Sequence, residues 1–164
     1  ELRCSGLFGY LRTSSASSLF NKGLIKVSNL NRNTTDDRSQ MYVGGVCGQA
    51  ECDMSIMANE QDITVSCDLA SNVNSYIGGI TGVIAGNINQ SYNAKNISYV
   101  SKDGDIAYIG GLVGLSCKSA HTYNQVVDCY NSGEITTTCG GFGSVAGIVG
   151  QAEENCQQII QNIL

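Results

Sequence analysis

A short glycine-rich block recurs along this chain and constrains its fold more than any other feature. Counted from Gly6 through Gly45, Gly79 and Gly111 to Gly147, the steps are roughly 39, 34, 32 and 36 residues. Such spacing is typical of stacked repeats, in which each repeat buries its apolar side chains only against its neighbours. The five copies are Gly6-Leu7-Phe8-Gly9, Tyr42-Val43-Gly44-Gly45-Val46-Cys47-Gly48, Tyr76-Ile77-Gly78-Gly79-Ile80-Thr81-Gly82, Tyr108-Ile109-Gly110-Gly111-Leu112-Val113-Gly114 and Val145-Ala146-Gly147-Ile148-Val149-Gly150.

A second marker alternates with the first. In each copy an aromatic or small residue precedes an asparagine, and an isoleucine follows four positions after that asparagine. Beyond the isoleucine the chain alternates as a strand does, for example over Ile63-Thr64-Val65-Ser66. The copies are Phe20–Ile25, Ala58–Ile63, Tyr92–Ile97 and Tyr130–Ile135.

Together the two markers predict an all-β chain, a parallel β-solenoid (β-helix) of about four to five glycine-rich coils. We expect one domain over 1–164, with coils at approximately 1–40, 41–74, 75–106, 107–142 and a partial coil at 143–164. Glycine and asparagine tolerate positive φ and would form the corners, and the glycine pairs would let successive coils approach closely. For Gln151 to Leu164 a strand and a short helix are both possible.

The Gly-Gly-[Ile/Leu/Val]-x-Gly block followed by aromatic-Asn-x-Gly-x-Ile resembles the GLUG-type repeat. The best copy joins Tyr108–Gly114 to Tyr130–Ile135, whereas Ala58 and Asp62 depart from the pattern. The resemblance implies a β-helical fold and an extracellular or surface location, since such repeats occur in large surface proteins, many regarded as adhesins. It supplies no catalytic residues.

Charge and hydropathy exclude two classes of partner. The net charge is −5 without a basic stretch, which argues against nucleic acid. No apolar run reaches the roughly 20 residues of a membrane span. Both ends of the sequence fall inside a repeat, so we expect either continuation of a longer array or head-to-tail self-association into a filament.

The even number of cysteines predicts disulfides and an oxidising compartment, with buried free thiols as the alternative. Cys67 and Cys139 occupy the same phase two repeats apart, too far for a bridge. Cys117 with Cys156 and Cys129 with Cys139 are the plausible pairs. The candidates are Cys4, Cys47, Cys52, Cys67, Cys117, Cys129, Cys139 and Cys156.

Three asparagines match the N-glycosylation pattern: Asn33, Asn89 and Asn96. Alternation places Asn89 and Asn96 outward, because Ile88 and Ile97 belong to the inward row. Asn33 lies in a polar loop, Asn29 to Gln40. This loop and a second at Ser116 to Gln125 are where a ligand would bind, if either has a function beyond connecting coils.

Residues that could carry chemistry are few. Asp103-Gly104-Asp105 is better explained as a polar turn than as part of a calcium site. Asp62 and Glu134 take equivalent outward positions and could face each other only across an intervening coil. His121 has no evident nucleophile partner. We therefore expect no catalytic, cofactor-binding or metal-binding residues.

Tyr42, Tyr76 and Tyr108 recur once per coil, which favours a stacking ladder in the wall over a sugar-binding platform. The sequence thus predicts a non-enzymatic, extracellular structural or adhesive module that stacks head to tail, with a surface glycan or protein as possible ligand. The alternative is a carbohydrate-binding or polysaccharide-active β-helix.

Overall fold

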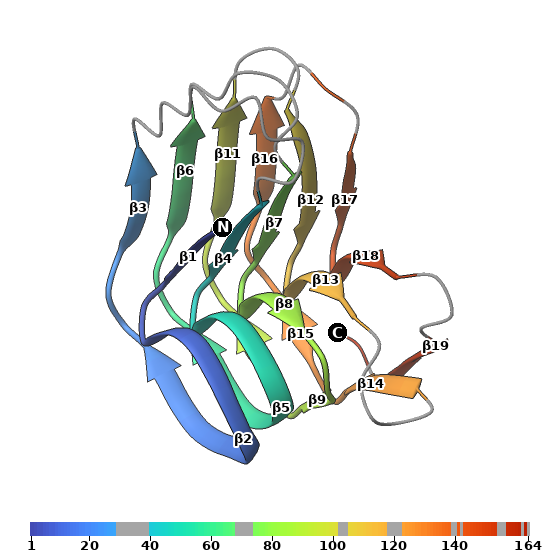
Figure 1. Cartoon of the computed structure of the whole chain (residues 1–164). Helices are drawn as coiled ribbons and strands as arrows, with labels where there is room; N and C mark the ends of the chain where they lie inside the picture. Colours follow the sequence, from blue (N-terminus) through green and yellow to red (C-terminus); the bar gives the residue numbers. More distant parts are fainter. Residues whose placement is uncertain are drawn as a thin grey trace.

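The computed structural model describes residues 1–28, 40–67, 74–101, 105–117, 123–138, 141, 143–153, 157–161 and 163, and the described residues form strands and turns without a helix. Every strand pair is parallel, and the strands form three sheets (Figure 1). The first sheet has the order β1 (Leu2–Ser5), β4 (Gln40–Gly44), β7 (Asn74–Gly78), β12 (Ile106–Gly110) and β17 (Ser144–Ala146).

The second sheet contains the two longest strands, β2 (Phe8–Asn21) and β5 (Cys47–Asn59), which curve strongly in Figure 1. In later coils the same path is divided into shorter strands. These are β8 (Thr81–Ile84), β9 (Ile88–Asn89), β10 (Tyr92–Asn93), β13 (Val113–Ser116), β14 (Tyr123–Val127), β15 (Tyr130–Asn131), β18 (Val149–Ala152) and β19 (Gln157–Gln161). The third sheet consists of β3 (Ile25–Ser28), β6 (Ile63–Cys67), β11 (Ile97–Ser101) and β16 (Ile135–Thr138).

These sheets confirm the predicted parallel β-solenoid. The solenoid has about three turns, slightly fewer than the four to five coils expected. The register aligns equivalent positions of the repeat, for example Tyr42 beside Tyr76 and Tyr76 beside Tyr108. Towards the end of the chain, where a strand and a helix were both possible, residues 157–161 form strand β19.

The two sequence markers contact each other and divide the interior of each coil into two cores. A Cβ placed on Gly79 would lie 2.1 Å from the carbonyl oxygen of Gly111 and 2.5 Å from Cβ of Asn93. Gly45 meets Asn59 and Gly111 meets Asn131 in the same way. The coil is therefore pinched where the second glycine of each pair lies directly against the repeated asparagine, and only glycine leaves room for that approach.

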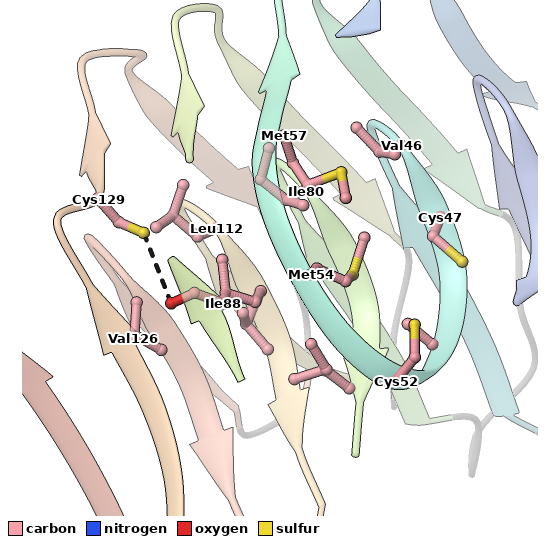
Figure 2. Close-up of a cluster of buried hydrophobic side chains, with 13 residues drawn as sticks. Val46, Cys47, Cys52, Met54, Met57, Ile80, Ile88, Leu112, Val126 and Cys129 are labelled. Carbon is pink, nitrogen blue, oxygen red and sulfur yellow. Dashed lines mark hydrogen bonds between the residues drawn. The ribbon is translucent and has the colours of Figure 1, made fainter. Parts of the chain in front are cut away.

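On one side of the pinch, the first and third sheets enclose a core that includes Val43, Ile77 and Tyr99. On the other side, the curve of the second sheet encloses a second core (Figure 2). This second core includes Val46 and Met54, both fully buried. The glycine-rich block thus contributes to both cores. Val43, before the glycine pair, lies in the first core, and Val46, after the pair, lies in the second.

The repeated asparagines form a ladder of side-chain amides that the sequence analysis did not predict. Nδ2 of Asn21 donates to Oδ1 of Asn59 at 2.8 Å, Asn59 to Asn93 at 2.7 Å, and Asn93 to Asn131 at 2.8 Å. Each Nδ2 also donates to the carbonyl two residues further along, as Asn93 does to Lys95 at 2.7 Å. The ladder thus gives hydrogen-bond partners to the amides of these four asparagines. The regular recurrence of asparagine was the available signal for it.

The corners do not use glycine as expected. None of the described glycines has a φ in the left-handed range, whereas four other residues do. These four occupy one equivalent corner of successive coils: Ser18 (φ 59°), Ile56 (57°), Gln90 (49°) and Asp128 (53°). The expectation that glycine supplies positive φ is therefore wrong here. Its role is close approach, because the pinch leaves no space for a Cβ.

Candidate functional site

The end of the solenoid formed by the first coil is the most distinctive surface of the described molecule. In the first coil, each of the three strands pairs with only one other described strand. Strand β1 pairs with β4, β2 with β5 and β3 with β6. Within the described residues, their other backbone edges all face the same end (Figure 1). We call this surface the end face. Open edges of this kind are templates for pairing with a further strand.

Apolar side chains are exposed on the end face although their equivalents in the next coil are buried. Leu7 is 43% exposed, whereas Val46 at the same position of the second coil is fully buried. Phe8 is 39% exposed, whereas Cys47 is fully buried. The difference arises because a neighbouring coil covers Val46 and Cys47 but none of the described residues covers Leu7 and Phe8. Tyr10, Phe20 and Leu24 are exposed as well.

A recess of about 460 Å³ opens on the end face between β1 and β3. Its lining includes Cys4, Gly6, Asn21, Ile25 and Val27. Asn21 is the first amide of the ladder, and Ile25 and Val27 belong to the core between the first and third sheets. The recess is thus the cross-section of the coil interior, viewed from its end.

The charged side chains of the first coil are mainly basic. Residues 1–28 contain Arg3, Arg12, Lys22 and Lys26 against one acid, Glu1. Arg12 lies 3.4 Å from Glu51 of the second coil, and Lys22 lies 3.6 Å from Glu60. Both pairs join equivalent positions of adjacent coils. Within the wall of the solenoid, ion pairs at equivalent positions of the repeat therefore join one coil to the next.

The predicted tyrosine ladder is confirmed. Rings of Tyr42 and Tyr76 lie 5.7 Å apart with an interplanar angle of 46°, and those of Tyr76 and Tyr108 lie 5.3 Å apart and nearly parallel at 12°. Tyr42 and Tyr76 are only 8% and 6% exposed, because they pack against Val83 and Leu115. Burial raises the pKa of Tyr42 to about 12. This ladder is part of the wall, and the rings of Tyr42 and Tyr76 are almost entirely covered, whereas Tyr108 is half-buried.

A second tyrosine pair lies nearer the surface. Tyr92 and Tyr130 stack at 5.1 Å with an angle of 3°. The Tyr92 hydroxyl donates to Glu60 at 2.6 Å, which raises the pKa of Tyr92 to about 12, and it is the main cause of a lowered pKa at Glu60. These contacts hold the side chains of neighbouring coils together.

Two of the three glycosylation candidates lie as predicted. Asn89 and Asn96 are exposed, and their neighbours Ile88 and Ile97 are fully buried. Asn33 lies outside the described residues.

No disulfide joins any two of the six described cysteines, so the disulfide prediction gains no support from them. Burial raises the pKa of Cys47 to about 12 and raises that of Cys52 and Cys129. These thiols stay protonated at neutral pH and are weak nucleophiles. Cys47, Cys52 and Cys129 therefore agree with the alternative prediction of free, buried thiols. The register places Cys67 beside Ser101, while Cys139 and Cys156, on which both predicted pairings depend, lie outside the described residues.

The acidic candidates have structural contacts. Asp62 accepts from the backbone N–H of Asn96 at 3.1 Å, and Asn96 accepts from that of Glu134 at 3.0 Å. Asn96 therefore separates the two carboxylates, as the repeat phase predicted. Asp105 is completely buried and accepts from the Tyr99 hydroxyl.

The remaining candidate residues lie outside the described part of the chain, and the described part contains no metal-binding cluster. Asp103, Gly104 and His121 lie outside the described residues, as do positions 29–39 and 118–122 of the two loops. Among the described residues, no group of three or more His, Cys, Asp or Glu side chains could hold a metal ion. The same part of the chain contains no helix long and apolar enough to cross a membrane.

Comparison of the chain with protein-family models, curated protein sequences and solved structures finds no match.

Proposed function

We propose that this chain is a non-enzymatic structural or adhesive β-solenoid module that stacks end to end into a longer array. The observation that carries the proposal is the end face: three open strand edges with exposed Leu7 and Phe8, whose equivalents one coil later are fully buried. Covering apolar side chains and pairing open strands both favour association with another coil of the same geometry.

The GLUG-like arrangement of the repeats supports a surface or extracellular location for the module. Exposed Asn89 and Asn96 are compatible with that location, since N-glycans attach only to secreted chains. The carbohydrate-binding alternative has weaker support, because Tyr42 and Tyr76 in the expected platform are almost entirely covered.

Sedimentation velocity and negative-stain electron microscopy of the 1–164 chain test the stacking. We expect association that grows with concentration and elongated particles. Phe8→Lys places a charge on the end face and should abolish association. Val100→Lys is the matched control, because Val100 is similarly exposed, at 46% against 39%, but lies on β11, which pairs on both sides. Monodisperse monomers of the unmodified chain at all concentrations would contradict the proposal.

Glycosylation is tested separately in protein secreted from eukaryotic cells. The intact mass should fall on treatment with an N-glycosidase, and Asn89→Gln or Asn96→Gln should each remove one glycan. Asparagine, and not Ser91, is the position to change, because the buried Ser91 hydroxyl also accepts from the Met57 N–H at 3.0 Å. An unchanged mass would exclude occupied sites.

A further inference from the structure

The charges of the described chain are arranged unequally along the solenoid axis. Residues 1–28 carry four basic side chains and one acidic one. Among the described residues from 123 onwards there is no lysine or arginine, and the acids are Asp128, Glu134 and Glu153. One end of the column is therefore basic and the other acidic.

The apolar positions of the first and last coils also correspond. The register carries Phe8 through Cys47, Thr81 and Val113 to Val149 of β18. Leu7, one position earlier, corresponds in the same way to Ile148. If the last coil of one copy lay against the first coil of another, Leu7 would lie over Ile148 and Phe8 over Val149. Leu7 and Phe8 would then each meet an apolar neighbour, whereas Tyr10 would lie over the polar Gln151.

One pair of charges corresponds as well. Arg12 is paired in register with Glu51, 3.4 Å away. Glu153 takes the same position in the last coil, because it follows Ala152, which is the partner of Ser116. Its N–H donates to the carbonyl of Ser116 at 3.0 Å, the hydrogen bond that a continuing parallel strand makes. In a head-to-tail joint, Arg12 would lie between Glu51 of its own chain and Glu153 of the next.

We propose that the end face binds the acidic C-terminal coil of a second copy of this chain, head to tail and in register, with Arg12 against Glu153. The proposal rests on the stacking function above and specifies its partner and polarity. Contact between two end faces would instead bring two basic coils together, which like-charge repulsion opposes. A head-to-tail joint leaves one free end of each kind, so it builds a filament and not a closed dimer.

Charge-reversal variants of the 1–164 chain test the joint, with sedimentation velocity as the measurement. Arg12→Glu should raise the dissociation constant about tenfold, which is about 1.4 kcal/mol. Lys22→Glu is the matched control. It makes the same change of net charge and also removes an ion pair to the next coil, but no described residue of the last coil takes its position in the repeat. We expect less than a threefold effect from this control.

A mixing experiment tests the polarity. Arg12→Glu alone and Glu153→Arg alone should each associate weakly, whereas an equimolar mixture should regain the association of the unmodified chain. A joint between two end faces would leave Glu153→Arg alone unaffected, so weak association of that variant together with recovery in the mixture identifies a joint between the first coil of one copy and the last coil of another. Circular dichroism checks that each variant is folded.

The outcomes separate the two proposals. If the unmodified chain associates but Arg12→Glu behaves like Lys22→Glu, or the mixture does not recover, the head-to-tail joint is wrong while stacking remains. If the unmodified chain does not associate at all, the proposed function itself fails.

Discussion

Asn93 occupies the middle of the buried amide ladder, with a partner on each side. It accepts from Asn59 and donates to Asn131, so Asn93→Ala would leave the buried amide of Asn59 and the half-buried amide of Asn131 short of one hydrogen bond each. We expect a loss of about 2–3 kcal/mol of unfolding free energy, because an unsatisfied buried polar group costs about 1–3 kcal/mol. Urea denaturation measures this loss. Asn89→Ala, at an exposed asparagine, should change stability by less than about 0.5 kcal/mol; equal losses would contradict the ladder's importance.

Ile56 is the residue least suited to its backbone conformation. Its φ is 57°, and the left-handed region costs L-residues roughly 1–2 kcal/mol, most of all β-branched ones. Ile56→Asn should therefore stabilise the protein by about 0.5–1 kcal/mol, since asparagine tolerates this region. The control is Val100→Asn, which makes a similar change at comparable exposure, 46% against 43%, but on a regular strand. That variant should destabilise. A loss of stability at Ile56 in thermal unfolding would refute the strain argument.

Asp105 links stability to pH. Burial is the main cause that raises its pKa above the usual 3.8, although the Tyr99 hydroxyl donates to it. The folded state therefore binds the proton more tightly than the unfolded state. This contribution to stability is complete below about pH 3.8 and is lost as pH rises through the folded-state pKa. Asp105→Asn, which stays neutral, should gain stability relative to the unmodified chain between pH 3 and pH 7. Urea titrations whose difference is constant over that range would contradict this prediction.

At the scale of the structural element, the pinch explains why the glycine pair recurs. Gly79→Ala would place a methyl group 2.1 Å from the Gly111 carbonyl oxygen, so we expect a loss of about 3 kcal/mol or more. Gly147 is the same motif position in the last coil, where no described atom lies within 4 Å. Gly147→Ala should therefore remain within about 0.5 kcal/mol of the unmodified protein. Urea denaturation compares the two, and equal costs would show that close approach is not the reason for the glycine.

At the scale of the whole molecule, the solenoid should open from its ends. Amides of β7 and β11 lie in strands paired on both sides, whereas β2 and β3 are paired on one side only. Strands with fewer neighbours unfold locally at lower free energy. Hydrogen exchange measured by mass spectrometry in dilute solution should show faster exchange in residues 8–28 than in 74–101. At concentrations that favour stacking, exchange in residues 8–28 should slow; uniform exchange at all concentrations would contradict both parts.

The spacing of the motifs by itself determined that the chain forms parallel coils and which residues alternate inward and outward. Ile88, Ile97 and the tyrosine ladder followed from that spacing, because a two-residue period and a repeat length are properties of short stretches of sequence. The tertiary structure alone decided that Gly79 lies against Asn93, that the asparagines bond to one another, and that Ile56 takes the left-handed corner. These features depend on the path by which the second sheet curves back to the glycine pair. Local sequence patterns do not encode that return path. They also do not encode the exposure of Leu7 and Phe8, which arises because no described coil covers the first coil on that side.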